Sequence, residues 1–101
     1  MVDEILRKEA FGPLTVAELA RRLNTSTRTL QLAYRKACGE TISRRLQNLR
    51  LSRIKDLLLK TELPITEVAL SAGYSAIASA QSAFRRQFGI SMRDFRKEKM
   101  Q

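Results

Sequence analysis

Polar and apolar side chains recur between Arg28 and Arg35 at the spacing of one helix face. Arg28, Gln31, Leu32 and Arg35 stand at positions i, i+3, i+4 and i+7. An arginine can donate two parallel hydrogen bonds to guanine, a glutamine can bind adenine in the same two-pronged way, and a leucine suits the methyl group of thymine. On a helix that enters the major groove, the first three of these side chains could therefore read bases.

The composition favours a polyanionic partner and no catalysis. The chain has 19 Lys and Arg against 10 Asp and Glu, a net charge of +9, which suggests nucleic acid before an anionic membrane surface. It has no histidine and a single cysteine, so we expect no metal site, no cofactor, no internal disulfide and no enzyme. Cys38 precedes Gly39 at a predicted helix end, where we expect a small, partly buried side chain.

The length and hydropathy indicate one soluble domain over residues 1–101. The chain is 44% hydrophobic and 29% charged, which is a globular balance. It lacks a membrane-length apolar run and a signal peptide, so we expect an intracellular protein. At 101 residues it can form a modest hydrophobic core but not two independent ones.

Helical periodicity predicts an all-α fold of seven helices without strands. The first helix spans about residues 3–11. Thr15 with Glu18 has the pattern of a capping box, and Ser26 caps the third helix. Asn24 suits a tight turn between the second and third helices, and Gly39 ends the third.

A fourth helix of about residues 42–60 is the longest. Its inward side chains are expected to be Ile42, Leu46, Leu49, Ile54, Leu57 and Leu58, and its other faces carry Arg44, Arg45, Arg50, Arg53 and Lys55. At about 1.5 Å per residue this helix spans roughly 28 Å, against about 34 Å between successive major grooves on one face of DNA. It could therefore hold two recognition helices in adjacent grooves.

The second half of the chain repeats the first. "AELARRLNTS" (17–26) aligns with "TEVALSAGYS" (66–75) at an offset of 49, and "YRKACGET" (34–41) aligns with "FRRQFGIS" (84–91) at 50, so the second turn is one residue longer. Each copy is a helix-turn-helix, at about 15–38 and 65–88. The predicted linker helix (42–60) joins them, and a closing helix of about 91–100 follows.

The repeat offset assigns the faces of both recognition helices. In the first, the inner side chains are Leu30, Ala33, Tyr34 and Ala37. In the second, the inner side chains are Ala80, Ala83, Phe84 and Gln87, and the outer ones are Ala78, Gln81, Ser82 and Arg85. The first helix offers two two-pronged readers, Arg28 and Gln31, whereas the second offers Gln81 alone. Substituting either of the first two should therefore relax specificity more than substituting Gln81.

From about Leu14 to Lys97 the chain resembles the DNA-binding domain of the AraC/XylS family of bacterial transcription regulators. The resemblance rests on "LTVAELARRLNTSTRTLQLAYRKACGETI", "RLQNLRLSRIKDLLLKTELPITEVALSAGYS" and "AFRRQFGISMRDFRK". The chain departs from the family pattern at Ala80-Gln81-Ser82 (commonly Phe-Ser-Arg), Met92 (commonly Pro) and Leu32 (often basic).

The resemblance implies seven helices, two helix-turn-helix motifs joined by a long helix, and sequence-specific binding of double-stranded promoter DNA in two adjacent major grooves. It also implies RNA polymerase as a partner, a separate N-terminal effector or dimerisation domain that this chain lacks, and a place in the bacterial cytoplasm, at the nucleoid. Such a domain reads bases with some side chains and holds phosphates with others.

The predicted base readers are Arg28, Gln31, Leu32, Ala78, Gln81 and Ser82. The predicted phosphate-binding cations are Arg35, Lys36, Arg44, Arg45, Arg53, Arg85 and Arg86. Amides at helix starts near Thr15, Thr41, Thr66 and Ser91 are further phosphate contacts.

Alternatives from other classes stay open at this point. A protein-interaction module without DNA affinity would use Leu32 and the alanine-rich second recognition helix as a docking patch. A membrane-surface protein would need exposed apolar faces on individual helices, which the pattern does not favour. RNA-binding modules use aromatic platforms, and this chain has only six aromatic residues, several in predicted core positions.

Overall fold

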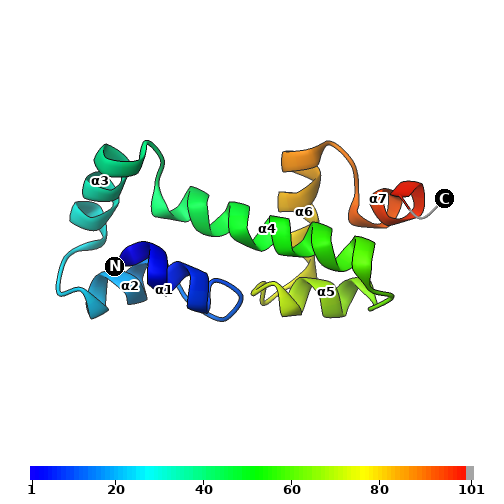
Figure 1. Cartoon of the computed structure of the whole chain (residues 1–101), viewed down its shortest axis with the longest axis horizontal. Helices are drawn as coiled ribbons and strands as arrows, with labels where there is room; N and C mark the ends of the chain where they lie inside the picture. Colours follow the sequence, from blue (N-terminus) through cyan, green and yellow to red (C-terminus); the bar gives the residue numbers. More distant parts are fainter. Residues whose placement is uncertain (100–101) are drawn as a thin grey trace.

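The computed structural model describes residues 1–99, and in this range it contains seven α-helices and no strand (Figure 1). The helices are α1 (Val2–Glu9), α2 (Val16–Arg22), α3 (Thr27–Cys38), α4 (Ile42–Lys60), α5 (Ile65–Ser71), α6 (Ile77–Phe88) and α7 (Met92–Lys99). The predicted all-α class is therefore confirmed. The predicted end of the closing helix at Met100 lies outside the described residues. None of the seven helices is both long enough and apolar enough to cross a bilayer.

Local capping explains why several helices begin where the sequence places them. The Thr15 hydroxyl accepts a hydrogen bond from the amide of Glu18 at 3.0 Å, and the Thr41 hydroxyl accepts one from the amide of Arg44 at 3.1 Å. The capping box at Thr15 is only half formed, because the Glu18 carboxylate accepts hydrogen bonds from Arg21 and Arg22 instead.

The two helix-turn-helix motifs differ in their turns, as the repeat predicts. Residues 23–26 separate α2 from α3, whereas residues 72–76 separate α5 from α6. Asn24 adopts a left-handed conformation with φ of 58°, which asparagine tolerates better than most residues. Ser26 caps α3 through the amide of Thr29, but the corresponding Ala76 offers α6 no side-chain cap. α5 begins at Ile65 with Pro64 as its N-cap, so Thr66 is its second residue and not its cap.

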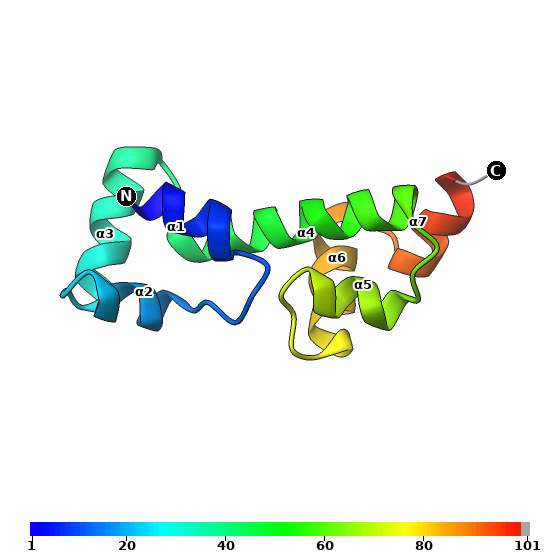
Figure 2. The ribbon, with the colours of Figure 1, turned by 60° about the horizontal axis from the view of Figure 1, so that its bottom comes forward.

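The long helix α4 is the spine of an elongated molecule that measures 47 × 22 × 21 Å. α3 stands near the start of α4 and α6 crosses its second half (Figure 1). In both views α3 and α6 run in about the same direction from their N-terminal ends (Figure 1 and Figure 2). The fold therefore presents two recognition helices that are separated along one long helix (Figure 1 and Figure 2).

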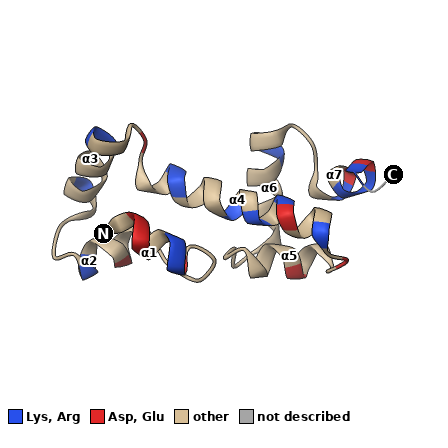
Figure 3. Cartoon of the chain, in the orientation of Figure 1, with Lys and Arg blue, Asp and Glu red and all other residues tan. Residues whose placement is uncertain are grey.

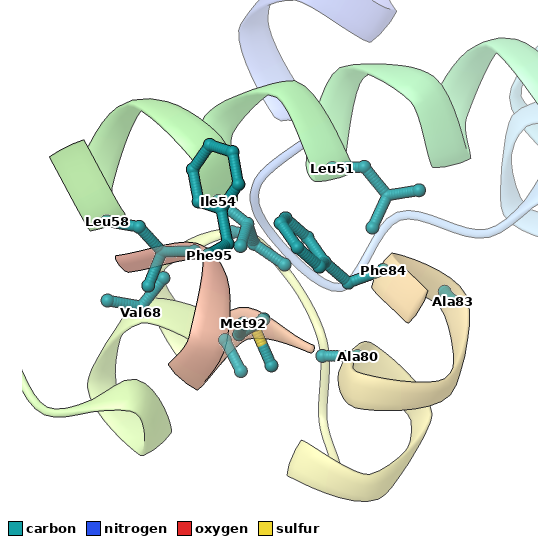
Figure 4. Close-up of a cluster of buried hydrophobic side chains, with 11 residues drawn as sticks. Leu51, Ile54, Leu58, Val68, Ala80, Ala83, Phe84, Met92 and Phe95 are labelled. Atoms are coloured by element: carbon teal, nitrogen blue, oxygen red, sulfur yellow. The ribbon is translucent and has the colours of Figure 1, made fainter. Parts of the chain in front are cut away.

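The hydrophobic core of the described residues forms two clusters, so the expected single core is wrong. The N-terminal cluster consists of Leu6, Ala10, Leu14, Leu19, Ala20, Leu30, Tyr34, Ile42 and Leu46. The C-terminal cluster, drawn in Figure 4, consists of Leu51, Ile54, Leu58, Val68, Ala69, Ala72, Ala80, Ala83, Phe84, Met92 and Phe95. Within it the rings of Phe84 and Phe95 meet edge to face at 5.6 Å between centroids.

The two clusters lie on different sides of α4. Leu46 faces the N-terminal cluster and Leu51 the C-terminal one. Five residues of helix rotate a side chain to about 140° from its starting direction, so the two halves of α4 turn their apolar residues different ways. Leu51, which is not among the expected inward residues, is buried in the C-terminal cluster, while the predicted core residues Leu49 and Leu57 are only half-buried.

Several other burial predictions are also corrected. Ala33 and Ala37 on α3, and Gln87 on α6, are exposed rather than inward. α6 packs against α4, α5 and α7, which buries Ala83, whereas α3 packs mainly against α2 and α4 and leaves the corresponding Ala33 open. Cys38 is exposed instead of partly buried, because it lies at the end of α3 beyond this packing.

Arg50, expected on an outer face of α4, is half-buried and ties the two halves of the molecule together. Its guanidinium donates hydrogen bonds to the carbonyl oxygens of Ala10, Gly12 and Leu14 at 2.7, 2.9 and 3.0 Å. Gly73 of the second turn approaches the same place, since a Cβ atom there would lie 2.9 Å from the Ala10 oxygen. The loop before α2 therefore contacts both α4 and the second motif.

Candidate nucleic-acid interface

The outer face of α3 is exposed and free of acidic residues. Arg28, Leu32 and Arg35 are exposed, as the helical spacing predicts, and Leu32 keeps 59% of its surface accessible. The Ser26 cap and the buried anchors Leu30 and Tyr34 fix this face. The Tyr34 hydroxyl donates to Asp3 Oδ1 at 2.8 Å, and burial together with this bond raises the pKa of Tyr34.

Gln31 lies on the same helix but its amide points into the protein. Its Oε1 atom accepts a hydrogen bond from the amide of Ile42 at 2.8 Å, and its Nε2 atom donates to the Ser43 hydroxyl at 2.9 Å. The side chain is half-buried. The two-pronged contact with adenine that the sequence predicts would require both of these bonds to break.

The outer face of α6 is formed by the side chains that the repeat offset predicts. Ala78, Gln81, Ser82 and Arg85 are all exposed. The last three line a hollow of about 330 Å³ together with Ser91, Met92 and Arg93 at the start of α7.

Arg93 is a cation that sequence reasoning missed. It lies in the first turn of α7, where a positive charge is unfavourable next to the helix dipole. This unfavourable position is the sequence feature that could have identified Arg93, because a cation at a helix start suits a site that also binds an anion.

A second hollow lies between α4 and α6 and brings two predicted phosphate ligands together. Arg44 and Arg86 line it with Gln47, Ala83 and Gln87, and its volume is about 320 Å³. Gln87 Nε2 donates a long hydrogen bond of 3.4 Å to Asn48 Oδ1. This places two guanidinium groups from distant parts of the sequence on one surface, between the recognition helices.

Two of the predicted phosphate ligands lie elsewhere. Arg45 borders a hollow with Asp3, Leu6 and Arg7 of α1. The guanidinium carbon of Arg53 lies 5.1 Å from the centroid of the Phe11 ring, a cation–π distance. Both residues therefore flank the N-terminal motif and are not part of the surface between the recognition helices.

The helix starts near Thr41 and Ser91 adjoin the recognition helices, and their hydroxyls cap α4 and α7. Thr15 instead lies in a hollow that Glu9 and Glu18 also line. Exposed Thr66 is the second residue of α5.

The recognition helices α3 and α6 carry basic residues and no acidic ones, whereas α1, α4 and α7 carry both signs (Figure 3). α3 and α6 contain no acidic residue, and α4 contains only Asp56. The ion pairs among residues 1–99 join Arg21 and Arg22 to Glu9 and Glu18 near α2, and these guanidinium groups lower the pKa of both carboxyls. Within this range none of the predicted phosphate-binding cations has an ion-pair partner, so they are available to an external anion.

Comparison with known proteins identifies the family of this helix-turn-helix fold. A family model described as "Helix-turn-helix domain" matches residues 19–98. The chain is 32% identical over 97 residues to the Msm operon regulatory protein of Streptococcus mutans, covering 96% of this chain and 35% of that protein. The chain spans between about a quarter and a third of the length of the first curated relatives, which are longer regulators.

Solved structures agree with the fold. An AraC-type transcriptional regulator of Chromobacterium violaceum superimposes with a TM-score of 0.80 and 26% identity, covering 99% of this chain and 89% of that one. The DNA-binding domain of AdpA, solved in complex with a target DNA, superimposes with a TM-score of 0.85 and 27% identity, covering 96% and 86%. The chain therefore belongs to the AraC/XylS family of transcription regulators, as a helix-turn-helix DNA-binding domain.

Proposed function

We propose that this DNA-binding domain recognises double-stranded promoter DNA in a sequence-specific way, with α3 and α6 in adjacent major grooves. The observation that carries the proposal is the pair of acid-free recognition helices, which run in about the same direction along α4. Helices in successive grooves on one face of DNA must share a direction and be separated by about one helical turn. α4, with 19 residues, has a length suited to this separation.

Base edges would be read by the exposed side chains of the two helices. In the first groove Arg28 would bind guanine and Leu32 would contact a thymine methyl group. In the second groove Gln81 would bind adenine, and Ala78 would at most touch a thymine methyl group. Ser82 would form a hydrogen bond with any of several bases and so would discriminate little between them. All five side chains are exposed, which supports these roles.

Phosphates would be held mainly by cations around and between the helices. Arg44 and Arg86 share one hollow and would bind the backbone that separates the two grooves. Arg35, Lys36 and Arg85, together with the Ser43 amide that follows Thr41 and the amides near Ser91, would hold strands beside each recognition helix. Arg45, Arg53, Thr15 and Thr66 would make only peripheral contacts.

The rest of the regulatory assembly is also a proposal. As a promoter-binding module the chain would act at the bacterial nucleoid, in the cytoplasm, with RNA polymerase as its protein partner. The longer relatives devote most of their length to other segments. We propose that such a segment binds an effector or mediates dimerisation in a regulator that contains this domain.

The salt dependence of binding tests the proposal. A duplex selected from random DNA should bind with an affinity that falls linearly on a logarithmic plot against salt, by roughly 0.9 per phosphate contact. The double variant with Arg44→Ala and Arg86→Ala should flatten this slope by about 2, because each phosphate-binding cation contributes about 1. Lys60→Ala, at the far end of α4, is the control and should leave the slope nearly unchanged.

An affinity that hardly changes between about 50 and 200 mM salt would contradict phosphate binding. Failure to bind any duplex, with capture of an acidic protein instead, would favour the protein-interaction module. The family assignment already favours DNA over that alternative, and it places the chain among DNA-binding domains and not among enzymes.

A further inference from the structure

Gln31 and Gln81 occupy equivalent positions in the two copies of the repeat, but the structure uses them differently. Both lie on a recognition helix, and they are 50 residues apart. The hydroxyls of Thr41 and Ser91, which cap the following helices α4 and α7, have the same spacing. Gln31 is half-buried, whereas Gln81 is exposed and makes no hydrogen bond to another part of residues 1–99.

In the first copy, Gln31 completes the cap of α4. The amide of Ile42 can only donate, so the side-chain oxygen of Gln31 must face it, at 2.8 Å. This leaves the Nε2 group directed at the Ser43 hydroxyl, at 2.9 Å. Thr41 caps the amide of Arg44, so the amides in the first turn of α4 are bound both by the N-cap residue of that helix and by a side chain of α3.

In the second copy the same arrangement is incomplete. The amide of Met92 corresponds to that of Ile42, and it has no acceptor among the described residues. Arg93 stands where the first copy has Ser43, so the hydroxyl that receives the glutamine amide is missing. Gln81 lines the hollow beside Met92 and Arg93 but is not held by them.

We propose that Gln31 is a positioning residue that clamps α3 to the start of α4, and that Gln81 alone of the pair reads a base. This inference rests on the proposed function for its second half, since reading requires DNA. The clamp fixes how α3 projects from α4. It removes Gln31 from the groove and leaves Arg28 as the two-pronged reader of α3.

Matched substitutions in binding-site selection separate the two roles. Gln31→Glu keeps an oxygen for the Ile42 amide and an acceptor for the Ser43 hydroxyl, so it should preserve the clamp. If residue 31 instead read a base, the same substitution would change the preferred base from adenine to cytosine. We therefore expect Gln31→Glu to select the wild-type sequence at every position, with a uniformly lower affinity from its added negative charge. Gln81→Glu should change or lose the preference at one base pair of the α6 half-site.

Amide hydrogen exchange tests the clamp without DNA. Gln31→Ala should speed exchange of the Ile42 amide by up to roughly tenfold, Gln31→Glu should restore slow exchange, and Gln81→Ala should leave the Met92 amide unchanged. A new base preference in Gln31→Glu, or an Ile42 amide indifferent to Gln31→Ala, would overturn the inference. An unchanged selection by Gln81→Glu would overturn its second half. If the wild-type chain selects no sequence, the proposed function fails, and the exchange data still decide the clamp.

Discussion

Two arginines bind backbone carbonyls and so act in the fold rather than on a partner. Arg50 holds the loop before α2 through Ala10, Gly12 and Leu14. Arg96 of α7 donates to the carbonyl oxygens of Leu58, in the last turn of α4, and of Leu63, after that helix, at 3.2 and 2.6 Å. A guanidinium group suits both places, because its planar fork can serve several acceptors at once.

Replacing Arg50 by lysine should therefore destabilise the protein. A lysine ammonium cannot reach the three carbonyls together, so we expect a loss of about 2–3 kcal/mol in the free energy of unfolding. Urea unfolding followed by circular dichroism measures it. Arg45→Lys, on the exposed surface of the same helix, should change stability by less than about 0.5 kcal/mol. Equal effects of the two substitutions would show that the Arg50 contacts contribute little.

Arg28 and Arg35 should differ in what they contribute to DNA binding. Arg28→Ala should relax the preference at one base pair by about 1–3 kcal/mol, more than Gln81→Ala does, since arginine on guanine is the commonest specific contact. Arg35→Ala should instead weaken all sequences alike and reduce the salt slope by about 1. Competition binding with single-base variants of the selected site checks both. A uniform loss in Arg28→Ala would place that residue on a phosphate.

At the scale of the elements, the two recognition helices differ at their N-cap residues. The Ser26 hydroxyl accepts a hydrogen bond from the amide of Thr29 at 3.0 Å. Ala76, at the same position in the second copy, is extended with φ of −135° and ψ of 132° and cannot accept one. α6 therefore depends on packing of Ala80, Ala83 and Phe84, while α3 also has a side-chain cap.

A serine at position 76 should stabilise the second motif. The backbone of Ala76 already has the extended conformation that a capping residue needs, so Ala76→Ser should raise the free energy of unfolding by about 0.5–1 kcal/mol. Ser26→Ala is the reciprocal control and should lower it by a similar amount. Thermal unfolding of the three proteins measures both changes. A destabilised Ala76→Ser protein would mean that the hydroxyl cannot reach the α6 amides.

At the scale of the whole molecule, α4 fixes the distance between the two motifs. The core clusters lie on different sides of this helix, and Arg50 and Gly73 add a contact between the halves beside it. Neither half can therefore move far along DNA without breaking packed contacts. A rigid pair of recognition helices should demand one spacing between half-sites.

Insertions between the half-sites test this rigidity. Adding about five base pairs turns one half-site to the opposite face, and adding about ten restores the face but moves it one turn away. We expect both insertions to reduce the affinity to that of a single half-site, measured by mobility shift on the selected duplex. Recovery of the affinity with an insertion of about ten base pairs would show that the motifs move independently. Duplexes with the same insertions outside the site are the control.

Much of the fold follows from residues that act locally. Thr41 marks the start of α4, and Asn24 and Gly39 mark the turn before α3 and the end of α3. These positions can be predicted because capping and left-handed conformations depend on near neighbours in the chain. The repeat also predicted that Ala78, Gln81, Ser82 and Arg85 of α6 are exposed, since both copies have the same periodicity, but it placed exposed Gln87 inward. Which of these side chains contact DNA stays a prediction.

The tertiary structure decided the features that depend on distant parts of the chain. The packing of α6 against α4, α5 and α7 separates buried Ala83 from exposed Ala33, and the approach of the loop before α2 turns Arg50 inward. Gln31 is the clearest case. Its spacing on α3 predicts a base reader, but a glutamine amide binds whichever donor and acceptor the fold brings to it. The fold brings the start of α4.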